Sequence, residues 1–73
     1  MSQLPILSGQ EIIRALSKIG YQILRQRGSH VRLSCQNRKN ITIPDYEAIS
    51  RGLLRKILRD ADLSAEEFIK LLK

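Results

Sequence analysis

The chain has 73 residues, 42% of them hydrophobic, which supports one small domain over residues 1–73 and excludes a second domain. A single cysteine, Cys35, excludes an intramolecular disulfide. Because Met1–Leu7 is too short and polar for a signal peptide, and no apolar run reaches the roughly 20 residues that span a bilayer, we expect a cytoplasmic protein. The net charge of +6 favours a polyanionic partner, and nucleic acid fits better than a membrane surface.

The first predicted helix spans Gly9–Ile19. Ser8 and Glu11 form a capping box, because the Ser8 hydroxyl can accept from the Glu11 N–H while the Glu11 carboxylate reaches back to Ser8. Apolar residues then recur at helical spacing: Ile12, Ala15, Leu16 and Ile19. Gly20 is well placed to end this helix.

A meander of antiparallel strands is predicted next, over Tyr21–Arg27, His30–Gln36 and Ile41–Ile43. Gly28-Ser29 is a two-residue turn of the kind that joins hairpin strands. Asn37–Asn40 is predicted to form a polar turn, and Pro44 to stop the last strand. Tyr21, which follows the helix directly, is expected to belong to the core.

Strand alternation assigns side chains to the two faces of this sheet. One face carries an apolar set, namely Val31, Leu33, Cys35, Ile41 and Ile43. Helices must cover this face, because a bare sheet of this size is not stable alone. His30, Arg32 and Thr42 are therefore predicted to point to the opposite, uncovered side.

Two further helices follow the loop Asp45–Ser50. Ser50 is predicted to cap a helix whose apolar positions are Leu54, Ile57, Leu58 and Ala61, with a basic stripe on its other side at Arg51, Arg55 and Arg59. Ser64 and Glu67 form another capping box, and the last helix turns Phe68, Ile69 and Leu72 inward. The element order is thus α-β-β-β-α-α, an α+β fold.

The basic residues are not spread evenly. No acidic residue lies between Ile12 and Pro44, whereas this stretch holds seven basic residues: Arg14, Lys18, Arg25, Arg27, Arg32, Arg38 and Lys39. His30, the only histidine, lies among them. Histidine is the side chain that most readily exchanges protons near neutral pH, so His30 is the first candidate for catalysis. An ordinary surface histidine is the alternative interpretation.

Three stretches together resemble the HicA family of mRNA interferase toxins, also called YcfA-like, from type II toxin–antitoxin systems. They are Leu4–Leu16 with Gly20-Tyr21, then Arg25–Leu33 with its Gly-Ser-His tripeptide, and finally Ile43-Pro44 with Gly52–Ser64. The resemblance extends from Leu4 to about Leu72. It depends on these stretches occurring in register, because Gly-Ser-His alone is a weak motif.

The resemblance implies a fold similar to a double-stranded-RNA-binding domain, with the helices on one face of a three-stranded antiparallel sheet. It also implies an endoribonuclease that cleaves mRNA without a metal or other cofactor, and it places the family's catalytic histidine at His30. The partner it implies is a HicB-like antitoxin that covers the active site and represses transcription together with the toxin. The free toxin is then expected to be a monomer that forms a hetero-oligomer with the antitoxin.

Family members often carry another histidine after the proline of the third strand, whereas this chain reads Pro44-Asp45-Tyr46-Glu47. RNA cleavage without a metal needs a base for the ribose 2′-OH and an acid for the leaving 5′-oxygen. One imidazole fills one of these roles, which leaves the other to water, a lysine, a tyrosine or no group. We therefore expect a slow enzyme.

The candidate RNA-binding residues are Arg25, Arg27, Gly28, Ser29, Arg32, Arg38 and Lys39. Guanidinium groups pair with phosphate bidentately, and Gly28 permits close approach of the backbone to a phosphate. Tyr46 is a further candidate for RNA contact, whereas a catalytic or metal-binding role for Cys35 is not expected. A non-catalytic RNA-binding module of the same fold is the alternative function.

Overall fold

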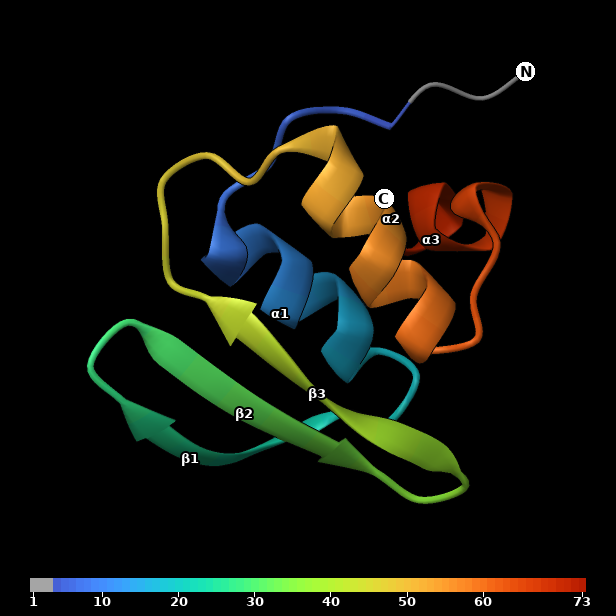
Figure 1. Cartoon of the computed structure of the whole chain (residues 1–73). Helices are drawn as coiled ribbons and strands as arrows, with labels where there is room; N and C mark the ends of the chain where they lie inside the picture. The colour runs from blue at the N-terminus through green and yellow to red at the C-terminus, as the bar shows by residue number, and fades with distance from the viewer. Residues whose placement is uncertain (1–3) are drawn as a thin grey trace.

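The computed structural model describes residues 4–73; residues 1–3, part of the N-terminal stretch judged above too short and too polar for a signal peptide, lie outside the described residues. The elements are α1 (Gly9–Ser17), β1 (Gln22–Arg27), β2 (His30–Cys35), β3 (Arg38–Pro44), α2 (Arg51–Asp60) and α3 (Ala65–Leu71). The strands form one antiparallel sheet in the order β1-β2-β3, and the helices lie on one side of it (Figure 1). The predicted α+β order is confirmed. No helix in residues 4–73 is long and apolar enough to cross a membrane.

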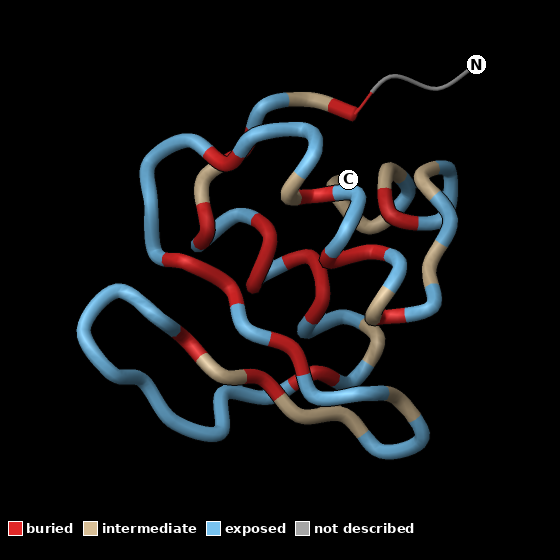
Figure 2. The backbone as a smooth tube through the Cα atoms, viewed as in Figure 1, coloured by how far each residue is buried: buried red, intermediate tan, exposed pale blue. Residues whose placement is uncertain are grey.

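The core lies between the helices and the covered face of β2 and β3. Val31, Leu33, Ile41 and Ile43 are each at most 3% exposed, as alternation predicted, and Cys35 packs half-buried at their edge. Figure 2 shows the buried positions of the strands and helices facing one another, whereas β1 is exposed along its whole length. The helices therefore cover β2 and β3 and leave β1 as an uncovered edge strand.

Both predicted capping boxes are present. The Ser8 hydroxyl accepts from the Glu11 N–H at 3.1 Å, and the Glu11 carboxylate accepts from the Ser8 N–H at 3.0 Å. Ser64 and Glu67 repeat this arrangement, with 3.0 Å for each bond. The backbone N–H of the cap, followed by its hydroxyl, lowers the pKa of each glutamate below the ordinary value of 4.5.

These boxes predict an acid-dependent loss of stability. Because the pKa of Glu11 and of Glu67 is lowered by folding, their contribution is complete above about pH 4.5 and is lost as the pH falls through the folded-state values. The double variant Glu11→Gln/Glu67→Gln should therefore show a smaller difference between its melting temperatures at pH 7 and pH 3 than the unmodified protein. An equally large difference in the variant would contradict this assignment.

The first helix ends at Ser17, two residues before the predicted end. The chain continues there as a 3₁₀-type turn, since the N–H groups of Lys18 and Ile19 donate to carbonyls only three residues back. Gly20 then takes φ +108°, and the Tyr21 N–H reaches the Leu16 carbonyl at 3.3 Å. This closes the helix in the manner of a Schellman motif, so Gly20 has the helix-ending role that was predicted for it.

The predicted polar turn Asn37–Asn40 is wrong, and so are the neighbouring strand ends. The turn contains only Gln36-Asn37, because Asn37 adopts a left-handed φ of 71° and β3 begins at once with Arg38. The Arg38 guanidinium donates to the carbonyls of Ala61 at 2.6 Å and Asp62 at 3.2 Å. A tertiary contact with the end of α2 thus extends a strand that local composition predicted to start at Ile41.

The segment before α1 belongs to the core, which the sequence did not indicate. Leu4 and Leu7 are buried, and Leu7 pairs with Ile49 through an N–H···O bond of 2.7 Å from Ile49 to Leu7. The Arg51 Nε donates to the Leu4 carbonyl at 2.6 Å. These two hydrogen bonds therefore hold the N-terminal segment against the start of α2.

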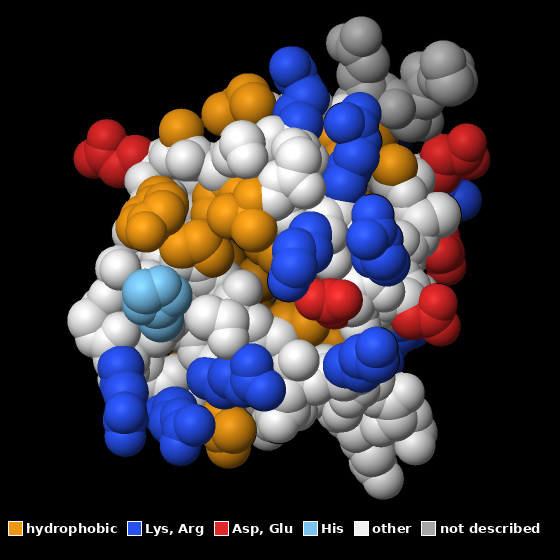
Figure 3. All heavy atoms as spheres, in the orientation of Figure 1, with side chains coloured by type: hydrophobic (Ala, Val, Ile, Leu, Met, Phe, Trp, Pro, Cys, Tyr) orange, Lys and Arg blue, Asp and Glu red, His pale blue; other side chains and the backbone are white. Residues whose placement is uncertain are grey.

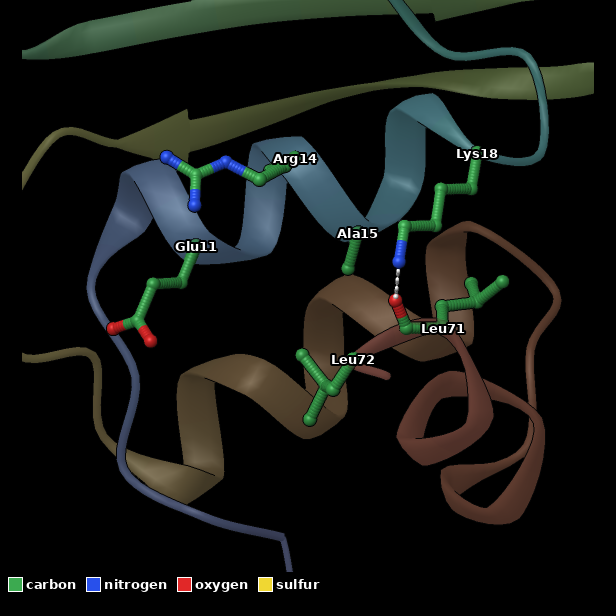
Figure 4. A pocket seen from close by; sticks show the side chains of 6 residues that line it. All are labelled: Glu11, Arg14, Ala15, Lys18, Leu71 and Leu72. Atoms are coloured by element: carbon green, nitrogen blue, oxygen red, sulfur yellow. Dashed lines mark hydrogen bonds between the residues drawn. The ribbon is translucent and has the colours of Figure 1, made fainter.

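The last helix is anchored to α1 by a lysine. The Lys18 Nζ donates to the carbonyls of Leu71 and Lys73 at 2.7 Å each, and Figure 4 shows the first of these bonds. A cation is favourable at this position because the carbonyl end of a helix carries partial negative charge. The pocket beside this contact, also drawn in Figure 4, has about 90 Å³, which is too small for a nucleotide.

Candidate functional site

The strand register gathers the candidate residues on the face opposite the helices. Arg27 pairs with His30, and Arg25 pairs with Arg32, which in turn pairs with Thr42. Directly opposed residues in antiparallel strands project to the same face. They line a hollow of about 230 Å³, called here the His30 hollow, formed by Arg25, Arg27, His30, Arg32 and Thr42.

A β-bulge explains why β1 contributes to this hollow. The register shifts between Ile23 and Arg25, so that Ile23 opposes the core residue Leu33 whereas Arg25 opposes Arg32. In a regular strand, Arg25 would share the face of Ile23, two residues before it. The extra residue moves Arg25 and Arg27 to the face of His30.

A fixed turn positions His30 at the first residue of β2. Gly28 takes φ +56°, the Gln26 side-chain amide donates to the Gly28 carbonyl at 3.0 Å, and the Ser29 carbonyl accepts from the Asp45 N–H at 2.6 Å. Within residues 4–73, the His30 imidazole makes no hydrogen bond or ion pair and is exposed. The ring is therefore accessible to a substrate, while these two hydrogen bonds fix the turn that precedes His30.

Arg32 is oriented by a residue that we did not predict as part of the site. Its Nη1 donates to the Thr42 hydroxyl at 2.9 Å across the β2–β3 pair. Alternation placed Thr42 on the open face, but only the register shows that it lies directly opposite Arg32. Arg25 and Arg27 make no comparable side-chain bond within the described residues, so their guanidinium groups are available to a ligand.

The structure does not bring Arg38 and Lys39 to this hollow. Arg38 opposes Cys35 at one end of the β2–β3 hairpin, whereas His30 opposes Pro44 at the other end. The Arg38 guanidinium is already bonded to the α2 terminus. Gly28 and Ser29 form the turn beside the hollow without lining it.

The two tyrosines differ in environment. Tyr21 is buried, its hydroxyl donates to the Lys39 carbonyl at 2.8 Å, and burial raises its pKa, in agreement with the predicted core position. Tyr46 is 50% exposed, and the Asp45–Ser29 bond places its loop beside the turn that precedes His30. Tyr46 is thus close to the open face but does not line the hollow.

The hollow combines one imidazole with three guanidinium groups. Figure 3 shows the single histidine (pale blue) above a group of Lys and Arg side chains (blue) on the visible surface. No carboxylate lines the hollow, and residues 4–73 contain no cluster of three His, Cys, Asp or Glu placed to hold a metal ion. Such a site suits a phosphodiester, whose negative charge the arginines attract while the imidazole exchanges a proton.

A comparison with known families agrees with this geometry. The family model described as the HicA toxin of bacterial toxin–antitoxin systems matches residues 9–63, which is 55 of the 73 residues. The match runs from the first residue of α1 past the end of α2 and includes the whole sheet. Comparisons with curated proteins and with solved structures gave no significant match. The chain belongs to the HicA toxin family.

Proposed function

We propose that this toxin is a metal-independent endoribonuclease that cleaves mRNA in the cytoplasm, with His30 as its proton-transfer group. Membership of the family makes the chain the toxin of a toxin–antitoxin system, with an antitoxin as its partner. The observation that carries the enzymatic proposal is the His30 hollow, in which an accessible imidazole lies among three arginines. A HicB-like protein is the antitoxin that we propose.

The arginines account for substrate binding. Arg25 and Arg27 project from the edge strand with guanidinium groups that bond to no side chain or backbone group of residues 4–73, while Thr42 holds Arg32 beside them. Guanidinium groups bind phosphate oxygens bidentately and remain charged at every physiological pH. We therefore place the RNA backbone across the uncovered face of β1 and β2, next to the turn that joins them, with one phosphate in the hollow.

The imidazole accounts for the chemistry. The ribose 2′-OH loses its proton and attacks the adjacent phosphorus; the bond to the 5′-oxygen breaks, and that oxygen takes up a proton. His30 performs one of these two proton transfers, and solvent water performs the other, because no second histidine, lysine or carboxylate from residues 4–73 lines the hollow. The arginines stabilise the additional negative charge of the phosphorane. The products are a 2′,3′-cyclic phosphate and a 5′-OH.

The test is incubation of the purified protein with a messenger RNA in excess EDTA. We expect slow cleavage that leaves 2′,3′-cyclic phosphate ends, detected by gel electrophoresis and mass spectrometry, and inhibition by the antitoxin. RNA that is bound but remains intact would instead support the alternative, a non-catalytic RNA-binding module. Cleavage that requires an added divalent ion would contradict the proposed chemistry.

Arg32 should contribute one phosphate contact. Arg32→Met is expected to weaken RNA binding about tenfold at moderate salt, because a charge-assisted hydrogen bond to phosphate is lost. The slope of log affinity against log salt should decrease by about 0.7, the value for one phosphate contact on a single strand. Arg14→Met, which removes an exposed arginine from α1 outside the hollow, is the matched control and should change neither quantity. Equal effects of the two variants would show that net charge alone drives binding.

A further inference from the structure

A second concave surface lies in the helical layer and shares no residue with the His30 hollow. This α2–α3 groove has about 370 Å³ and is lined by Leu4, Arg55, Leu58, Arg59, Leu63 and Ala65. Its volume falls within the roughly 300–1,000 Å³ typical of binding pockets. The ribonuclease proposal uses none of these residues.

The groove has an apolar interior and a basic rim. Leu4 and Leu58 are buried at its base, while Leu63 and Ala65 are partly exposed on its wall. Arg55 and Arg59 lie one turn apart on α2 and are both exposed. Figure 3 shows Lys and Arg side chains gathered over α2 around hydrophobic side chains.

The basic stripe of α2 divides into two parts with different roles. Arg51 is occupied by its bond to the Leu4 carbonyl and serves the fold. Neither the Arg55 nor the Arg59 guanidinium forms a hydrogen bond or ion pair with any residue from 4 to 73, and the nearby Asp60 is instead paired with Lys56 at 3.5 Å. Two adjacent, unpaired guanidinium groups beside an apolar depression are suited to a ligand that carries both carboxylates and apolar side chains.

We propose that the α2–α3 groove docks an acidic, amphipathic segment of the antitoxin. Its apolar side chains would pack against Leu63 and Ala65, and its carboxylates would pair with Arg55 and Arg59. This inference rests on family membership, which supplies the antitoxin partner, and not on the ribonuclease proposal. It gives the antitoxin a contact surface separate from the His30 hollow.

A protein segment fits this groove better than RNA does. No aromatic side chain of residues 4–73 lines the groove, so nucleic-acid bases have no ring there on which to stack. Exposed Asp62 and Glu66 flank the wall residues Leu63 and Ala65 and would repel phosphates passing along α3. The same acidic residues would not disturb a peptide whose carboxylates lie on the α2 side.

The test is charge reversal in the groove. Arg55→Glu/Arg59→Glu is expected to weaken binding of the toxin's own antitoxin at least tenfold, measured by titration calorimetry with the full-length proteins. The matched control, Arg14→Glu/Lys70→Glu, carries the same charge change on exposed positions of α1 and α3 outside the groove and should remain within about twofold. Arg55→Gln/Arg59→Gln provides a milder variant, and circular dichroism checks that each protein is folded.

The outcomes separate this inference from its alternatives. Loss of antitoxin binding with unchanged RNA affinity supports it, whether or not the protein cleaves RNA. It is overturned if antitoxin affinity is unchanged in both groove variants or falls equally in the control. Loss of RNA binding with antitoxin binding retained would assign the groove to nucleic acid, and a changed sedimentation coefficient of the free toxin would assign it to a second copy of this chain.

Discussion

Replacing His30 by alanine is expected to lower the RNA cleavage rate at least about 100-fold while changing RNA affinity by no more than about twofold. General acid–base catalysis by one positioned group is worth roughly 10² to 10⁴ in rate. Among residues 4–73, no titratable group other than His30 and the arginines lines the hollow, so none of these residues takes over the proton transfer. The phosphate contacts, which arise from Arg25, Arg27 and Arg32, remain in place. Single-turnover cleavage and filter binding at the same salt concentration measure the two effects.

The control for the His30→Ala variant is a measurement of its thermal stability. His30 is exposed and makes no side-chain hydrogen bond within residues 4–73, so His30→Ala should melt within a few degrees of the unmodified protein. His30→Gln, which keeps a polar side chain of similar reach, should be as inactive as His30→Ala. Substantial cleavage by either variant would remove His30 from the chemistry.

Replacing Gly9 by alanine is expected to destabilise the fold by about 3 kcal/mol, because the added methyl group has no space. A Cβ at this position would overlap the carbonyl oxygen of Pro44 and lie 3.1 Å from the Asp45 Cα. Both neighbours are backbone and cannot rotate away, and the Gly9 N–H is bonded to the Tyr46 carbonyl at 2.8 Å. In a domain of this size the loss corresponds to roughly 15 °C in melting temperature.

Gly52 provides the matched comparison. It also lies in the first turn of a helix, but a Cβ there meets no atom within 4 Å. Gly52→Ala should therefore leave stability unchanged or raise it by up to about 1 kcal/mol, since alanine is the better helix former. Similar melting temperatures for the Gly9 and Gly52 variants would show that α1 can move away from β3 at little cost. A large loss only at Gly9 would establish the close helix–strand contact.

Features encoded by local spacing were predictable from the sequence. Capping boxes at Ser8 and Ser64 require only residues three apart, and both are present. Alternation along β2 and β3 predicts which side chains are buried. This prediction does not depend on where each strand begins or ends, because successive side chains always point to opposite faces. The same alternation predicted the side of the sheet on which His30 lies.

Features that depend on distant contacts were not predictable. β3 begins at Arg38, before the predicted start at Ile41, and the Arg38 bonds to the end of α2 involve residues more than 20 positions away. The buried N-terminal segment depends on the pairing of Leu7 with Ile49. The close approach that requires Gly9 likewise forms only when β3 and α1 are packed.

In the site as well, the features that depend on local spacing are predictable and those that depend on distant contacts are not. His30 and Arg32 were assigned to one face from alternation within a single strand. The contribution of Arg25 and Arg27 to that face depends on the bulge after Ile23, which has no marker such as glycine in the sequence. Thr42 orients the Arg32 guanidinium only because the strand register places the two residues directly opposite each other.

The most direct test of the proposed chemistry places one 2′-deoxynucleotide in an RNA substrate, immediately 5′ of a mapped cleavage site. With the unmodified protein in excess EDTA, we expect cleavage at this position to stop, while cleavage at neighbouring sites and RNA affinity are unaffected. The substitution removes the attacking 2′-oxygen and leaves the phosphate contacts in place. Cleavage of the 2′-deoxy position at the rate of the all-ribose substrate would contradict the account.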